Sequence, residues 1–184
     1  MYLFVATHLG SGASLLCESM NLHRVCAWHR GNGSYKHGSD LVKMKDGANW
    51  AKVHFDKITH NHQFTCPSLY RQCQFVYVIR EPAATFANLI QYKGYLPDRA
   101  FLYYTFRLRR LCEMVKKTPK SVVLRADDLF SGRGLETVQK SLGLRDPVPF
   151  AYTPEPVPDV DVPHDLVTSA QAVYDRYLSV MLKR

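Results

Sequence analysis

Short apolar runs separated by longer amphipathic stretches recur along the chain. The apolar runs are rich in β-branched and aromatic side chains and predict strands at Tyr2–Ala6, Arg24–Trp28, Ala51–Phe55, Phe75–Ile79 and Ser121–Leu124. The amphipathic stretches predict helices at Ser14–Met20, Ala83–Gln91, Asp98–Lys117, Leu135–Leu144 and Leu166–Leu182. We expect Ser14 to be the N-cap of the first helix. Strands that alternate with helices predict an α/β fold with a central, mainly parallel sheet flanked by helices.

Two segments have neither pattern. The first, at about 29–50, is polar and contains glycines, which predicts a long loop. The second, at about 147–163, is rich in proline and is expected to be extended before the last helix. A chain of 184 residues suits one hydrophobic core. We therefore expect residues 1–184 to form a single domain.

Charge narrows the possible partners. Lys plus Arg is 24 and Asp plus Glu is 16, so the formal net charge is +8. A basic excess favours anionic partners such as a phosphorylated cofactor, an acidic surface or nucleic acid. No basic-aromatic repeat or nucleic-acid reader motif is present, so we expect no nucleic-acid partner. No apolar run reaches the roughly 18 residues of a membrane helix, so we expect no membrane span.

Cysteines and histidines are scattered. The chain has 5 cysteines, and no pair has the C-x-x-C spacing of a zinc or redox site. The pattern predicts reduced thiols in a cytoplasmic protein. No metal-binding spacing of histidines occurs, so we expect no metal site.

A glycine-rich turn follows the first predicted strand. Gly10-Ser-Gly-Ala-Ser-Leu15 lies between that strand and a helix, where converging backbone amides and a helix N-terminus can hold an anion. A plain tight turn explains the glycines equally well. The lysine of the nucleotide-kinase phosphate loop is absent after Gly12, which argues against metal-dependent ATP chemistry.

A second candidate anion site follows the strand Phe75–Ile79. Arg80 stands at the end of this strand, and Asn88 lies on the following helix. A guanidinium and a side-chain amide together can form a phosphate clamp. The alternative is that Arg80 pairs with Glu81 or caps a helix.

These segments together resemble the PAPS-dependent sulfotransferase family (PAPS is 3′-phosphoadenosine 5′-phosphosulfate). Gly10–Leu16 is similar to the family's 5′-phosphosulfate loop, and Val76–Asn88 is similar to its 3′-phosphate motif. Ser121–Leu129 resembles the family's following strand, and Ser141–Leu144 resembles the end of its next helix. Phe55–Asn61 is similar to the segment that carries catalytic side chains. The matches occur in the family's order and extend over residues 2–144.

The resemblance implies a P-loop-like three-layer domain that moves a sulfuryl group from PAPS to a hydroxyl or amine acceptor, without a metal, and releases PAP (adenosine 3′,5′-bisphosphate). The acceptor would be a small molecule or a glycan. The resemblance places PAPS against the 5′-phosphosulfate loop and the 3′-phosphate clamp, formed by Gly10, Ser11, Gly12, Ala13, Ser14, Leu15, Arg80 and Asn88.

The resemblance also assigns catalytic roles. His60 is the expected general base, with His54 and His62 as rivals, and Lys57 is expected to stabilise the leaving phosphate. The alternative is that these are surface histidines beside the end of a strand. Arginines of the Asp98–Lys117 helix are expected on a solvated face.

Gly10 stands where the family carries a basic residue. His8 could replace that charge. A non-catalytic PAP-, PAPS- or glycan-binding protein of the same fold, or a nucleotide or small-molecule kinase, therefore remains an alternative function. The oligomeric state is not indicated by the sequence.

Overall fold

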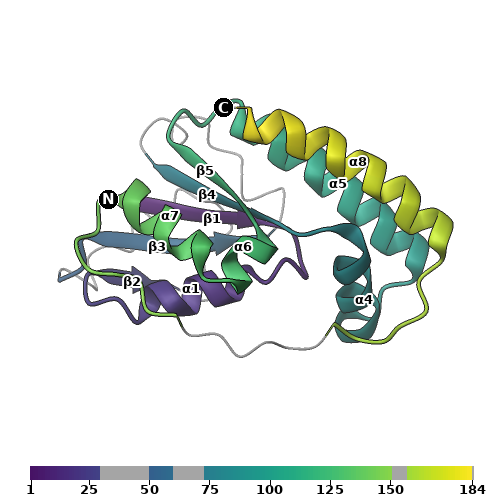
Figure 1. Cartoon of the computed structure of the whole chain (residues 1–184), viewed down its shortest axis with the longest axis horizontal. Helices are drawn as coiled ribbons and strands as arrows, with labels where there is room; N and C mark the ends of the chain where they lie inside the picture. Colours follow the sequence, from purple (N-terminus) through teal and green to yellow (C-terminus); the bar gives the residue numbers. More distant parts are fainter. Residues whose placement is uncertain (30–49, 60–72, 151–156, 184) are drawn as a thin grey trace.

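A parallel sheet forms the centre of the molecule. The computed structural model describes residues 1–29, 50–59, 73–150 and 157–183. In these residues the strands are β1 (Tyr2–Thr7), β2 (Cys26–Trp28), β3 (Val53–Ile58), β4 (Gln74–Ile79) and β5 (Ser121–Arg125). Their spatial order is β2-β3-β1-β4-β5, and every neighbouring pair is parallel (Figure 1). The predicted α/β class and parallel sheet are confirmed.

Helices follow the strands along the chain. They are α1 (Ala13–Asn21), α4 (Pro82–Lys93), α5 (Pro97–Val115), α6 (Ala126–Phe130), α7 (Arg133–Leu142) and α8 (His164–Leu182). The short helix α6 was not predicted, because it follows β5 directly with no turn signal between them. The predicted cap was wrong: Gly12, with a φ of 78°, is the N-cap of α1, and Ser14 lies inside the helix.

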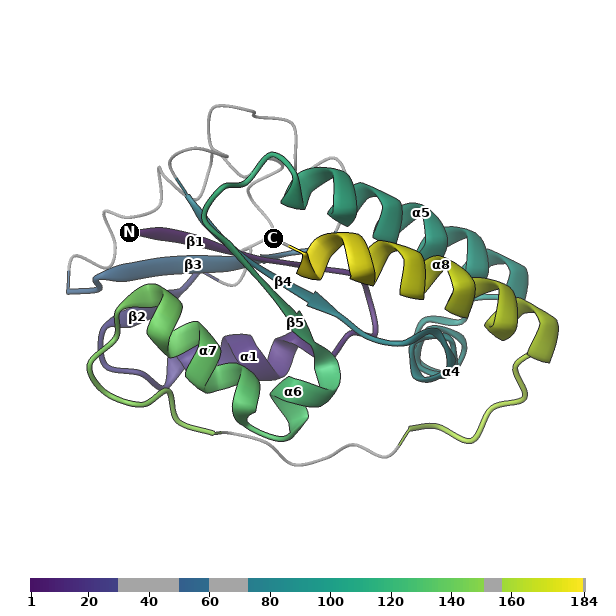
Figure 2. The ribbon, with the colours of Figure 1, turned by 45° about the horizontal axis from the view of Figure 1, so that its top comes forward.

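Two hydrophobic cores lie on opposite faces of the sheet. One contains Phe4 and Ala6 of β1 with buried side chains of α4, α5 and α8. The other contains Leu3 and Val5 of β1 with buried side chains of α1 and α7. Successive residues of a strand point to opposite faces, so one central strand contributes to both cores. Figure 2 shows α5 and α8 on one side of the strands and α1 and α7 on the other.

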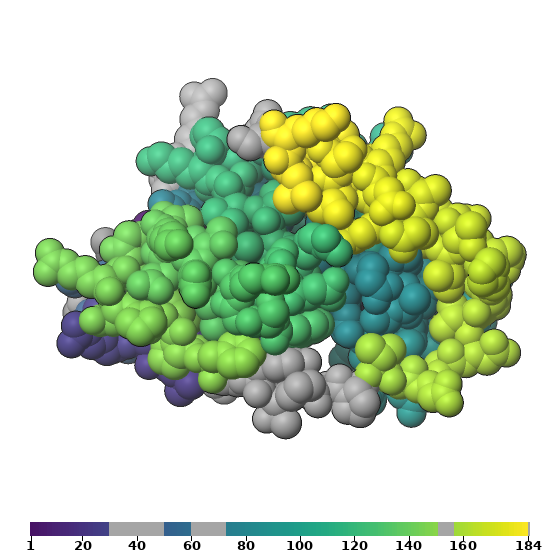
Figure 3. Space-filling model, in the orientation of Figure 1, coloured from purple at the N-terminus to yellow at the C-terminus, as the bar shows by residue number. Residues whose placement is uncertain are grey.

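Helix α8 is the outermost element of the first face. It packs along α5 and also contacts α4. In Figure 3 its yellow side chains lie beside the teal side chains of α4, while β5, α6 and α7 cover the other half of this view in green. None of the helices in the described ranges combines the length and the apolar character that crossing a bilayer requires.

The connections of β1 and β4 leave the sheet in opposite directions. β1 leads into α1 on the second face, whereas β4, its neighbour in the sheet, leads into α4 and α5 on the first face. The two connections therefore diverge beyond the carboxyl ends of neighbouring strands, which is the usual ligand position in parallel α/β sheets. The loops after β1 and β4 contain the two anion-binding segments predicted from the sequence.

Candidate functional site

The turn after β1 combines two left-handed glycines with a helix N-terminus. Gly10 and Gly12 have φ values of 76° and 78°, which side chains with a Cβ rarely adopt. The amide of Ala13 donates to Ser11 Oγ at 3.3 Å, and the amide of Leu15 donates to the Gly12 carbonyl at 3.0 Å. In the described part of the chain, no acceptor takes the amides of Ser11, Gly12 or Ser14. These three amides are available to an anion.

Ser11 points inward and fixes the turn. Its hydroxyl hydrogen-bonds to Thr7 Oγ1, and Thr7 Oγ1 in turn donates to the Val78 carbonyl of β4 at 2.9 Å. Both hydroxyl side chains are buried. The glycine-rich turn is thereby attached to the neighbouring strand, while the Ser11 side chain serves the turn and leaves only its amide for a ligand.

Arg80 reaches back to the glycine-rich turn. Its Nη1 donates to the Gly10 carbonyl at 3.4 Å, and its guanidinium carbon lies 5.0 Å from the centre of the Phe130 ring. Phe130 also packs on Gly12, where an added Cβ would lie 2.6 Å from the ring. Arg80 and the turn after β1 are therefore in contact beyond the carboxyl ends of β1 and β4. Phe130, which the sequence analysis did not single out, joins them.

Glu81 and Asn88 have defined partners near Arg80. The Glu81 carboxylate accepts from the Ala84 amide at 3.0 Å and caps α4. Asn88 donates to the Ala84 carbonyl at 2.8 Å, and its Cβ lies 3.3 Å from the place that a Gly10 Cβ would occupy. The structure thus brings Asn88 to the turn as well. It also gives Glu81 the capping role, in place of an ion pair with Arg80.

His8 is buried and neutral. Its Nδ1 donates to the Leu9 carbonyl at 2.9 Å, and its Nε2 accepts from the Arg80 amide at 3.0 Å. Burial, together with smaller contributions from the charges of Arg107 and Arg80, lowers the pKa of His8 to about 4. The expectation that His8 could replace the basic residue missing at Gly10 is therefore wrong. Instead, the ring supports the backbone of Arg80.

A cation reaches the turn from β3. Lys57 Nζ donates to Ser14 Oγ at 2.7 Å. Lys57 on β3 pairs in register with Val5 on the neighbouring strand β1. Its side chain therefore lies on the same face of the sheet as Val5, which is the face covered by α1. Strand β3 was predicted to end at Phe55 but continues to Ile58, so Lys57 lies within the strand. Lys57 on β3, Ser14 at the start of α1 and Arg80 directly after β4 therefore lie around the turn.

Helix α5 holds the same edge of the sheet from the first face. Arg107, only 1% exposed, donates from Nε to the Thr7 carbonyl at 2.9 Å and from Nη2 to the Ile58 carbonyl at 3.0 Å. Tyr103 Oη accepts from the Leu9 amide at 2.9 Å, and Tyr104 Oη donates to the Arg80 carbonyl at 2.6 Å.

The expectation of a solvated arginine face on α5 is wrong for Arg107, whose pKa burial lowers to about 10. The residue belongs to the buried stripe of α5 that includes Ala100, Tyr104, Leu108 and Leu111. Its position in that helical period is the sequence signal that could have identified it.

The candidate bases are only partly placed. His60 and His62, together with most of the predicted 29–50 loop, lie outside the described residues. His54 is buried on β3 and pairs in register with Tyr2, at the amino end of β1. Its Nδ1 lies 3.3 Å from His29 Nε2. His54 is therefore several residues along the sheet from Lys57 and the glycine-rich turn.

Among the described residues, no group of three or more His, Cys, Asp or Glu side chains is arranged to hold a metal ion. The described cysteines, Cys17, Cys26, Cys73 and Cys112, are buried free thiols. The donors gathered around the glycine-rich turn are amides, a guanidinium, an ammonium and a hydroxyl, which suits an anion.

No protein-family model matches the chain, and no curated protein matches it.

Proposed function

We propose that the protein is a sulfotransferase that moves a sulfuryl group from PAPS to a hydroxyl or amine acceptor. The observation that supports this most directly is the contact between the two candidate anion-binding segments. Arg80 Nη1 lies 3.4 Å from the Gly10 carbonyl, although 70 positions separate the two residues in the chain. A ligand with phosphate groups at two places on one adenosine needs such a paired site.

The residues present suit that ligand in charge and in donor type. The free amides of Ser11, Gly12 and Ser14 would hold the 5′-phosphosulfate, and Arg80 with Asn88 would hold the 3′-phosphate. The fold is then a P-loop-like domain without the phosphate-loop lysine. PAPS supplies the activated sulfuryl group when it is bound.

Lys57 supplies the charge that Gly10 lacks. Its ammonium already lies at Ser14 Oγ, at the mouth of the turn. Sulfuryl transfer spreads negative charge over oxygens, and a fixed cation stabilises that charge more effectively than water does because it needs no reorganisation. His60 remains the proposed base that removes the acceptor proton. A small-molecule or glycan acceptor and a cytoplasmic location remain part of the proposal.

Calorimetry with PAP, ATP and AMP, with and without Mg²⁺, tests the binding part. We expect PAP to bind most tightly without metal and Arg80→Ala to weaken binding at least tenfold, about 1.4 kcal/mol. Arg109→Ala, an exposed arginine paired with Glu113 on α5, is the matched control and should leave the PAP affinity unchanged. A preference for ATP with Mg²⁺ would instead identify a kinase.

Transfer of labelled sulfate to a panel of acceptors tests catalysis. Lys57→Ala and His60→Ala should each lower kcat about 100-fold or more while PAP still binds. Lys93→Ala, on the exposed C-terminal turn of α4, is the control for Lys57. PAP binding with no transfer to any acceptor would favour the non-catalytic PAP-binding alternative, for which the glycine at position 10 is the supporting feature.

A further inference from the structure

A cavity with basic residues in its lining lies at the opposite end of the strands from the proposed PAPS site. It has a volume of about 220 Å³ and is lined by His23, Arg24, Val25, Lys52, Gly143, Leu144, Arg145 and Asp146. These residues precede β2, precede β3 or follow α7, so the cavity lies at the amino ends of the strands. The Gly10–Ser14 turn and Arg80 lie at the carboxyl ends, so the proposed PAPS site does not include this cavity.

The walls of the cavity are joined by hydrogen bonds. The Val25 carbonyl accepts from the amides of Lys52 at 2.9 Å and Val53 at 3.0 Å. His23 Nε2 donates to the Asp146 carbonyl at 3.2 Å, and its Nδ1 accepts from the Val25 amide at 3.4 Å. Three segments distant in sequence are thereby held around one space, which exists before any ligand binds.

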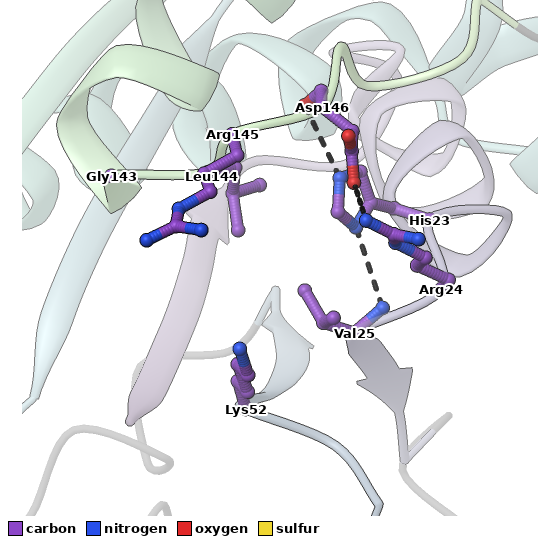
Figure 4. Close-up of a pocket in the computed structure, with 8 residues that line it drawn as sticks. All are labelled: His23, Arg24, Val25, Lys52, Gly143, Leu144, Arg145 and Asp146. Atoms are coloured by element: carbon purple, nitrogen blue, oxygen red, sulfur yellow. Dashed lines mark hydrogen bonds and ion pairs between the residues drawn. The ribbon is translucent and has the colours of Figure 1, made fainter.

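The charges around the cavity do not balance. Arg24 pairs with Asp146 at 2.6 Å, and this exposed pair forms one rim. No carboxylate in the described part of the chain lies within 4.0 Å of the charged nitrogens of Lys52 or Arg145. Figure 4 shows the Lys52 ammonium pointing into the space below Leu144 and Val25, with Arg145 on the side of Leu144 away from Arg24. Lys52 and Arg145 are thus the two lining cations that no carboxylate of the described residues neutralises.

We propose that this cavity binds a tetrahedral oxyanion, either free phosphate or sulfate or the end of a small ester. A guanidinium fork and a lysine point charge together match the oxygens of such a group. The volume is below the roughly 300–1,000 Å³ of pockets that enclose a drug-sized ligand, so it suits the anionic group rather than a whole nucleotide.

Amide NMR with inorganic phosphate tests the site. The titration uses Arg80→Ala protein, so that phosphate bound at the Gly10–Ser14 turn does not compete, and balances ionic strength with chloride. We expect saturable shifts of the Val25, Leu144 and Asp146 amides. Lys52→Gln and Arg145→Gln should each raise the Kd at least fivefold. The exposed cations Lys116 and Arg176, changed to Gln, are the matched controls.

Two results would overturn the proposal: shifts that rise linearly and are reproduced by chloride, or equal weakening by the control substitutions. Either would identify ordinary counterion screening by surface cations. Asp146→Asn frees Arg24 and should tighten phosphate binding; weaker binding in this variant would count against the charge argument. Phenyl phosphate distinguishes a free oxyanion from the end of a small ester. Tighter binding than inorganic phosphate identifies an ester as the ligand, and weaker binding identifies the free ion.

Discussion

Gly12 shows how one residue determines the shape of the proposed site. Its left-handed backbone turns the chain into α1, and its missing side chain lets the Phe130 ring lie on the turn. That ring is also the surface on which the Arg80 guanidinium rests. The quadrupole of an aromatic ring holds a cation over its face. The N–H groups at the edge of the guanidinium remain free to donate hydrogen bonds. Phe130 thus positions Arg80 relative to the turn.

Gly12→Ala should destabilise the protein by about 2–3 kcal/mol, through a strained left-handed residue and a displaced Phe130 ring. Gly132→Ala is the matched control, because Gly132 has a φ of 81° and nothing lies within 4 Å of its added Cβ. Gly132→Ala should lower the free energy of unfolding by about 1 kcal/mol. Urea denaturation measures both. Equal losses would show that the Phe130 contact contributes nothing.

His8 makes stability depend on pH. Its pKa is about 4 in the folded protein, against about 6.5 when exposed. Between these values the unfolded chain binds more protons, so the free energy of unfolding falls as pH falls from 6.5 to 4, by on the order of 3 kcal/mol. His8→Gln should remove this part of the slope in urea denaturation measured across that range. The same change at the exposed His164 should leave the slope intact.

At the scale of elements, α5 determines the geometry of the carboxyl edge. Tyr103, Tyr104 and Arg107 bond to backbone groups of Leu9, Arg80, Thr7 and Ile58, which follow or end three different strands. One rigid helix thereby fixes the spacing between the turn after β1, the start of Arg80 and the end of β3. Lys57 belongs to that last strand, so its distance to the turn depends on the same helix.

Arg107→Met should lower the free energy of unfolding by about 2–4 kcal/mol, because two buried carbonyls lose their charged donor. The exposed Arg109→Met on the same helix should change it by less than about 0.5 kcal/mol. Thermal or urea denaturation of the two variants measures both changes in the free energy of unfolding. A loss at position 107 no larger than at 109 would mean that water replaces the guanidinium at both carbonyls.

The sequence predicted the strongly periodic elements and missed those defined by tertiary contacts. β1 and β4 are unbroken apolar runs and were found within one residue. β3 was placed too early, because buried His54 and Asp56 interrupt its apolar pattern. Arg80 and the glycine-rich turn were identified from their local motifs. Phe130 and Arg107 were not, since one lies on an unpredicted helix and the other carries a charge that burial does not usually tolerate.

At the scale of the whole molecule, strand order has a consequence for how the chain is made. β1 is synthesised before β3 and β4 but lies between them in the sheet. Leu3 pairs with Phe55 and Gln74, so both of its neighbours leave the ribosome much later. Until both neighbours are available, the apolar residues of β1 have no partner strands. Formation of the sheet therefore depends on contacts between segments distant in sequence, which is expected to slow folding.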